Sequence, residues 1–121
     1  PQYDDLQAVY DAYRDQGLVV IGVPSNDFGR QELATADAIK TFCEVNFNIT
    51  FPMADKTIVK GNEAHPFYTW AADELGAMSR PRWNFHKYLV GRDGRLIDWY
   101  ASTTNPNGNK IRKAIEAALK A

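Results

Sequence analysis

The sequence predicts one α/β domain with a mixed sheet, and three observations carry this prediction. Apolar residues recur at helical spacing in four separate stretches of the chain. The run Leu18 to Val23 is continuous and rich in β-branched residues, as expected of a parallel strand buried on both faces. Two further strand-like stretches, His86 to Val90 and Arg95 to Tyr100, flank an Asp-Gly pair that signals an antiparallel hairpin.

The first helix is predicted to begin at the chain start and to end before Gly17. A proline loses no needed N–H in a first turn, and carboxylates there meet the positive end of the helix dipole. The residues in question are Pro1, Asp4 and Asp5. An apolar stripe with i, i+3, i+4, i+7 spacing follows, formed by Leu6, Val9, Tyr10 and Tyr13.

The middle of the chain is predicted to hold two more helices and a short extended piece. A polar loop, Ser25 to Arg30, follows the predicted strand, and Thr35 can cap a second helix. Its apolar side would carry Ile39, Phe42, Cys43 and Asn46. Phe51 to Met53 is the extended piece, and a third helix should run from about His65 to Leu75. That helix would place Phe67, Trp70 and Ala71 together.

The chain is expected to end in an amphipathic helix after the polar stretch Ser102 to Asn109. Its apolar face would consist of Ile111, Ala114, Ile115, Ala118 and Leu119. With 121 residues and 13.6 kDa, the chain has material for a single domain covering residues 1–121.

Composition narrows the classes of partner. A formal net charge of −1 and a pI near 6.1 give no electrostatic reason to expect binding to nucleic acid or to an anionic membrane. No apolar run approaches the roughly 18 residues of a spanning helix. Cys43 is the one cysteine, so no disulfide can form within residues 1–121. His65 and His86 lack the spacing of a metal site, and we expect both to be structural or surface residues.

The residues most suggestive of chemistry are Gln31, Trp83 and Asn84. An indole N–H and two carboxamides can hold a small oxyanion or a thiolate without adding a full charge. Taken singly, each residue has a simpler explanation: a core tryptophan, a turn asparagine and a surface glutamine. The case for a site depends on the three acting together.

Several short motifs occur in a recognisable order along nearly the whole chain. They are Pro1-Gln2-Tyr3, the strand Leu18 to Val23 running into residues 24–32, Phe42-Cys43, Phe51-Pro52, Asn62 with His65-Pro66, Trp83-Asn84-Phe85 with Lys87, and Asp93-Gly94. In this order they resemble the glutathione peroxidase family of thiol peroxidases. The resemblance implies a thioredoxin-like, three-layer α/β/α fold with a mixed sheet, which in residues 1–121 would lack its central N-terminal strand.

The same resemblance implies an antioxidant thiol peroxidase that reduces hydrogen peroxide or organic hydroperoxides through a cysteine sulfenic acid. The nucleophile, a cysteine or selenocysteine, would lie just upstream of Pro1, and Gln31, Trp83 and Asn84 would hold it. No metal or organic cofactor is expected; thioredoxin or glutathione would be the thiol co-substrate. The alternative is a catalytically inactive, truncated relative that serves as a binding or structural module.

Cys43 is open to two interpretations. In some thioredoxin-linked family members a resolving cysteine lies in a similar Phe-Cys setting on the second helix, and the helix must then unwind to form a disulfide. A small buried hydrophobic residue would serve equally well at this position. The resemblance also implies a monomer, because the stretch between Trp70 and Trp83 is short, as in family members that lack the subunit-contact loop of the tetrameric animal enzymes. We expect a cytoplasmic location, with a periplasmic or secreted one left open by a sequence that begins at Pro1.

Overall fold

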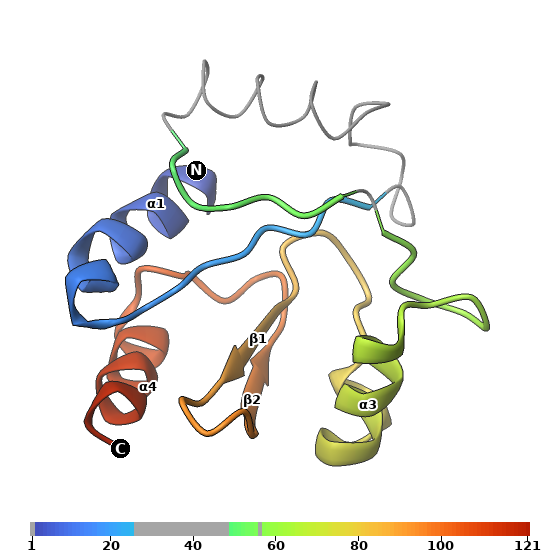
Figure 1. The fold of residues 1–121 in the computed structure, drawn as a ribbon. Helices are drawn as coiled ribbons and strands as arrows, with labels where there is room; N and C mark the ends of the chain where they lie inside the picture. The colour runs from blue at the N-terminus through green and yellow to red at the C-terminus, as the bar shows by residue number, and fades with distance from the viewer. Residues whose placement is uncertain (1, 26–48, 56) are drawn as a thin grey trace.

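The computed structural model describes residues 2–25, 49–55 and 57–121 (Figure 1). The helices are α1 (Gln2–Tyr13), α3 (Pro66–Leu75) and α4 (Asn109–Lys120), with short 3-10 turns η1 (Arg14–Gln16) and η2 (Ala77–Ser79). The strands β1 (Lys87–Val90) and β2 (Leu96–Tyr100) form the hairpin. The second predicted helix, with Cys43, lies outside the described residues, as does Gln31.

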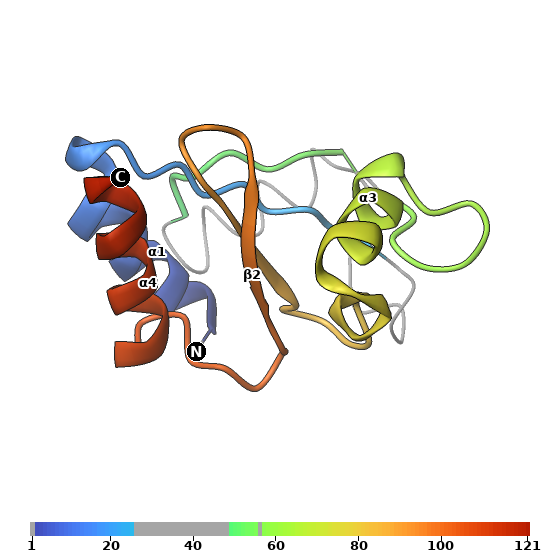
Figure 2. The same ribbon diagram turned by 90° about the horizontal axis from the view of Figure 1, so that it is seen from below.

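The hairpin is covered on both faces by helices. Figures 1 and 2 show α1 and α4 side by side on one face and α3 on the other. The α1/α4 face buries a cluster that joins both helices to β2: Val9, Tyr13, Tyr100, Ile111 and Ile115. Burial of such side chains contributes about 1.5–3 kcal/mol each, which explains why the two ends of the chain lie together.

The first helix ends as the sequence predicts. Gly17 adopts a left-handed conformation with φ 112° and its N–H donates to the Arg14 carbonyl at 3.1 Å. A residue with a Cβ is disfavoured in this conformation, so glycine stops the helix here. The Arg92 guanidinium, on the hairpin turn, donates to the Gln16 carbonyl at 2.8 Å and ties the helix end to the hairpin.

The segment Leu18 to Val23 departs from its prediction. It is extended, but it forms only an isolated parallel bridge, between Gly22 and Met53. The Gly22 N–H donates to the Pro52 carbonyl at 2.9 Å, and the Ala54 N–H donates to the Gly22 carbonyl at 2.7 Å. Among the described residues, Leu18 to Val23 therefore pairs only with the segment around Met53, and this pairing is too short to form a strand.

Burial of this segment on both faces was also wrongly predicted. Leu18 and Val20 pack against the two hydrophobic clusters. Val19 and Ile21 point the other way and are 66% and 61% exposed. Within the described residues the sheet is the two-stranded hairpin, so the larger mixed sheet remains a prediction.

The hairpin and the other helices agree with the sequence. Tyr88 pairs with Trp99 and Leu89 with Asp98 in antiparallel register, with an irregularity between Leu89 and Val90. Gly94 takes φ 82° in the connecting turn, as the Asp-Gly signal predicts. At α3, the His65 imidazole accepts from the Phe67 N–H at 3.1 Å, which makes His65 the N-cap. None of the helices in the described ranges is long and apolar enough to cross a membrane.

Gln7 joins α1 to the segment that follows residue 48. Its side chain is buried, and its carbonyl oxygen accepts from the Thr50 N–H at 2.9 Å. Its amide nitrogen donates to the Thr50 hydroxyl at 2.8 Å and to the Asp11 carboxylate at 2.9 Å. One side chain thus satisfies a backbone donor that lies 43 residues away in sequence.

We predict that Gln7→Ala lowers the free energy of unfolding by about 1–3 kcal/mol, because it leaves the Thr50 N–H without its partner. Asp11→Ala, which removes only the exposed partner of Gln7, should cost less than about 0.5 kcal/mol. Urea unfolding followed by circular dichroism compares the two. Equal losses would contradict the anchoring role of Gln7.

Candidate functional site

Trp83 and Asn84 lie together on a tight turn between η2 and β1. Trp83 is 52% exposed and Asn84 is half-buried. The next residue, Phe85, has φ 63°, and it is the one residue other than glycine with positive φ in the described ranges. A left-handed backbone costs a residue with a Cβ roughly 1–2 kcal/mol, so neighbouring contacts must hold the turn.

One such contact places the turn beside the start of α1. The rings of Phe85 and Tyr3 meet edge to face with centroids 5.1 Å apart. Tyr3 belongs to the first turn of α1, where the N–H groups that have no partner within the helix give a partial positive charge. The indole and amide donors of Trp83 and Asn84 therefore lie on a turn that packs against the positive end of a helix.

The chain that leads into this turn is anchored by the carbonyl oxygen of Ser79. Ser79 is fully buried, and its carbonyl accepts from the Tyr88 hydroxyl at 2.6 Å and from His86 Nε2 at 2.8 Å. A carbonyl can only accept, so Nε2 carries the proton. The Ser79 hydroxyl donates to the Gly76 carbonyl at 2.7 Å, which fixes the residue to the end of α3.

The two donors to Ser79 are held by an aromatic cluster on the α3 face of the hairpin. The His86 ring stacks on Trp99 with centroids 5.4 Å apart and planes 14° apart. The Tyr88 ring meets Phe67 of α3 edge to face at 5.2 Å. Burial lowers the pKa of His86, while its bond to the Ser79 carbonyl opposes that shift. His86 is therefore structural, which agrees with its predicted role.

Lys87 lies next to the turn. Its ammonium donates to the Phe85 carbonyl at 2.6 Å, and burial lowers the pKa of the amine from 10.5 to about 8. Lys87 is opposite Tyr100 in the hairpin register, on the face that packs against α1 and α4. A cation is thus held close to the segment that presents Trp83 and Asn84.

Comparisons with known proteins identify the family of this chain. Residues 1–72 match the family model described as glutathione peroxidase. The glutathione peroxidase homolog BsaA of Halalkalibacterium halodurans is 40% identical over 121 residues, covering 98% of this chain and 76% of that protein. The chain belongs to the glutathione peroxidase family.

Two further relatives and one solved structure are similar to this chain over nearly its whole length. The glutathione peroxidase-like peroxiredoxin HYR1 of Saccharomyces cerevisiae is 37% identical and covers 99% of this chain and 74% of its own length. The hydroperoxy fatty acid reductase gpx1 of Synechocystis is 39% identical, with 98% and 74% covered. The crystal structure of Trgpx in apo form superposes with a TM-score of 0.77 at 37% identity, covering 99% of this chain and 71% of that one.

The structure describes two of the three predicted site residues, Trp83 and Asn84. Trp83 and Asn84 are neighbours on one turn next to α1, as a shared site requires. Gln31 and Cys43 lie outside the described residues, so their positions remain predictions. Sequence reasoning missed Ser79, and it gave no role to Tyr88 or Lys87. The available signal was the alternation in residues 86–90, which puts His86 and Tyr88 on one face and Lys87 on the other.

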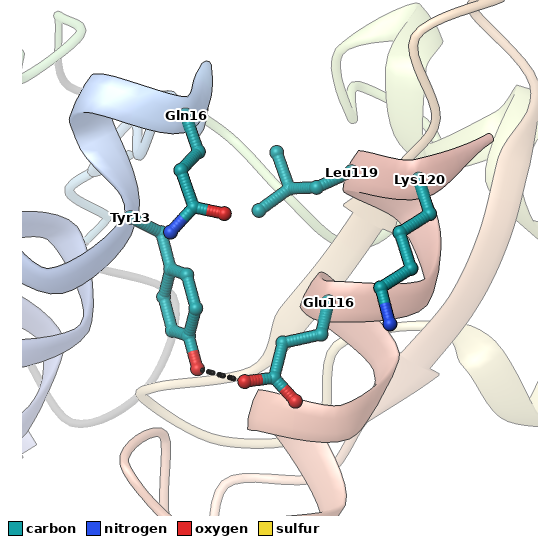
Figure 3. A pocket seen from close by; sticks show the side chains of 5 residues that line it. All are labelled: Tyr13, Gln16, Glu116, Leu119 and Lys120. Carbon is teal, nitrogen blue, oxygen red and sulfur yellow. Dashed lines mark hydrogen bonds between the residues drawn. The ribbon is translucent and has the colours of Figure 1, made fainter.

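A separate hollow lies at the opposite end of α1. It has a volume of about 340 Å³ and is lined by Tyr13, Gln16, Glu116, Leu119 and Lys120 (Figure 3). The Tyr13 hydroxyl donates to the Glu116 carboxylate at 2.8 Å, so the hollow is bounded by a bond between α1 and α4. A 12-residue helix is about 18 Å long, which separates this hollow from the turn at Trp83. Within the described ranges, no three His, Cys, Asp or Glu side chains gather as metal ligands would.

We predict that Tyr88→Phe and His86→Phe each lower the free energy of unfolding by about 1 kcal/mol, because each leaves one donor on the Ser79 carbonyl. The double variant should lose about 1 kcal/mol more than the sum, because the buried carbonyl then has no donor. A double-mutant cycle from denaturant unfolding tests this. If the two losses in the free energy of unfolding are strictly additive, the two donors do not compensate for each other at the Ser79 carbonyl.

Lys87 should make stability depend on pH. Its pKa is about 8 in the folded protein and near 10.5 when unfolded, so the unfolded chain binds the extra proton between these values. Stability should therefore rise as pH increases from about 8 to about 10, relative to Lys87→Met. The gain should be about 1–2 kcal/mol, allowing for solvent screening of a half-exposed amine. Chemical denaturation at several pH values measures it; parallel curves for both proteins would contradict it.

Proposed function

We propose that the protein is a thiol-dependent peroxidase that reduces hydrogen peroxide or organic hydroperoxides through a cysteine sulfenic acid. The observation that carries this proposal is the Trp83–Asn84 turn packed against the first turn of α1 through Phe85 and Tyr3. Gln31, Trp83 and Asn84 would donate to the reacting sulfur and to the peroxide oxygens. Homology to glutathione peroxidase-like thiol peroxidases supports the same reaction.

The proposed chemistry explains why donors of this kind are needed. A thiol has a pKa near 8.5, and only its thiolate attacks the O–O bond, so groups that bond the anion raise the reactive fraction at pH 7. The thiolate sulfur forms a bond to one peroxide oxygen as the O–O bond breaks. The sulfur is oxidised to the sulfenic acid, and the departing oxygen takes a proton and leaves as water or an alcohol. Neutral N–H donors stabilise the charge on that oxygen.

We propose that the nucleophile precedes Pro1 by a few residues, as the family's Pro-Gln-Tyr motif implies. A residue there would lie near the positive end of α1 and near Phe85, which packs on Tyr3. We also propose the thioredoxin-like three-layer fold for the whole protein, with a central strand between Leu18–Val23 and β1. The arrangement of α1 and α4 on one face and α3 on the other supports it.

The co-substrate is proposed to be a thiol, thioredoxin or glutathione, that reduces the sulfenic acid back through a disulfide and releases water. Cys43 would either supply the resolving thiol or pack as a small hydrophobic residue. The names of relatives, a peroxiredoxin and a hydroperoxy fatty acid reductase, support organic hydroperoxides among the substrates. The protein is proposed to act as a monomer.

A second candidate function is a binding or structural module without redox turnover. One observation favours it: Cys43 is the single cysteine in residues 1–121, and in the sequence it follows α1 rather than preceding it. Steady-state peroxide consumption with a thiol reductant separates the two functions. In the protein that includes the residues before Pro1, peroxide consumption supports the peroxidase, and its absence supports the module.

We predict that Trp83→Phe and Asn84→Ala each lower the rate constant for peroxide reduction about 10-fold to 1000-fold in the protein that carries the nucleophile, because each removes a donor to the reacting atoms. The melting temperature should change little, since Trp83 is 52% exposed. Stopped-flow kinetics with hydrogen peroxide and a fatty acid hydroperoxide measure the rates.

The matched control is Trp70→Phe. Trp70 is also a partly exposed tryptophan, at 38%, but it belongs to α3 and packs on Phe67. Its replacement should leave the peroxide rate constant near the wild-type value. Equal effects at Trp70 and Trp83 would show that the loss is structural and would refute the assignment of Trp83.

A further inference from the structure

The turn that carries Trp83 and Asn84 is held in a conformation that its own residues do not favour. Phe85 has φ 63°, a region that L residues with a Cβ adopt at a cost. A bulky residue stays there only when its surroundings fix both its backbone and its side chain. The structure offers one contact for each.

The side chain of Phe85 is fixed by the Tyr3 ring of α1. The backbone is fixed by Lys87, whose ammonium donates to the Phe85 carbonyl at 2.6 Å. A hydrogen bond from an ammonium is about twice as strong as one between neutral groups, so it can offset the cost of the left-handed residue. The bond spans two residues and closes the turn on itself.

The position of Lys87 in the strand makes this bond specific. Alternation along β1 sends His86 and Tyr88 to the α3 face, where both donate to the Ser79 carbonyl. Lys87 goes to the opposite face, next to Tyr100 and the α1 layer. The loop is thus held in two ways: His86 and Tyr88 tie its exit to Ser79 at its start, and Lys87 holds the Phe85 carbonyl within it.

We propose that Lys87 is a positioning residue of the peroxidase site: its ammonium holds the left-handed Phe85 turn and thereby orients Trp83 and Asn84 toward the start of α1. This inference rests on the proposed function for its effect on rate, but its structural part stands on the turn alone. Burial lowers the pKa of the amine to about 8, so at pH 7 most of the molecules still carry the ammonium that donates to the Phe85 carbonyl.

The test replaces Lys87 with methionine, which keeps the apolar stem and loses the donor, and with arginine, which keeps a cationic donor. Protein labelled with 5-fluorotryptophan gives separate fluorine resonances for Trp70, Trp83 and Trp99. At pH 7, Lys87→Met should move the Trp83 resonance and leave the Trp70 resonance in place. Lys87→Arg should keep the Trp83 resonance close to its wild-type position.

The rate measurement follows the same pattern in the protein that carries the nucleophile. Lys87→Met should lower the rate constant for peroxide reduction about 10-fold to 100-fold, because small displacements of positioned groups have effects of this size. Lys87→Arg should recover most of that loss. Lys113→Met, an exposed lysine on α4, is the matched control and should match the wild type in both measurements.

Each outcome decides one proposal. If the Trp83 resonance in Lys87→Met matches the wild type, Lys87 does not position the turn and the inference fails. If all three tryptophan resonances move together, the variant has lost its fold in general, and Lys87→Gln replaces it in the same comparison with the same criterion. If the wild-type protein with its nucleophile consumes no peroxide, the proposed function fails, and the Trp83 resonance still decides the role of Lys87.

Discussion

The carbonyl of Ser79 is the constraint on which the arrangement of this chain depends. It lies at the end of η2, fully buried, and it needs donors because water cannot reach it. The donors come from β1 and the residue before it, so the bonds of His86 and Tyr88 to one carbonyl fix the end of α3 relative to β1. The separation of the helical layer from the hairpin is set by that requirement.

The same requirement restricts where the turn with Trp83 and Asn84 can lie. The residues between Ser79 and β1 must leave and return within a short distance, and they do so through a tight turn that ends in a left-handed phenylalanine. The Phe85 ring packs against the ring of Tyr3, which belongs to the first turn of α1. The proposed site therefore combines α1 and the 83–85 turn, which are distant in sequence and are joined by packing.

Much of the helical architecture could be predicted from local sequence. The stripe on α1, the terminal amphipathic helix and the Asp-Gly turn depend on neighbours within a few residues, and these agree with the structure. The family could be predicted from collinear motifs, and the comparisons confirm it. The neighbouring positions of Trp83 and Asn84 also follow from sequence.

What could not be predicted depends on distant partners. Leu18 to Val23 has the composition of a buried strand, but a strand also needs a ladder along its length, and composition does not say how much ladder it receives. The convergence of His86 and Tyr88 on Ser79 is equally invisible, because nothing in a serine marks its carbonyl as an acceptor of two donors. The role of Lys87 required the conformation of Phe85, which no residue propensity indicates.

The extended segment from Leu18 to Val23 indicates where a further strand can pair with this chain. Alternate side chains on it, those of Val19, Ile21 and Val23, are apolar and exposed. A backbone that is extended and presents aliphatic groups in a row is a template on which another strand can assemble. The central strand that we propose between Leu18–Val23 and β1 would pair with this segment, and it would cover backbone that is left unpaired among the described residues.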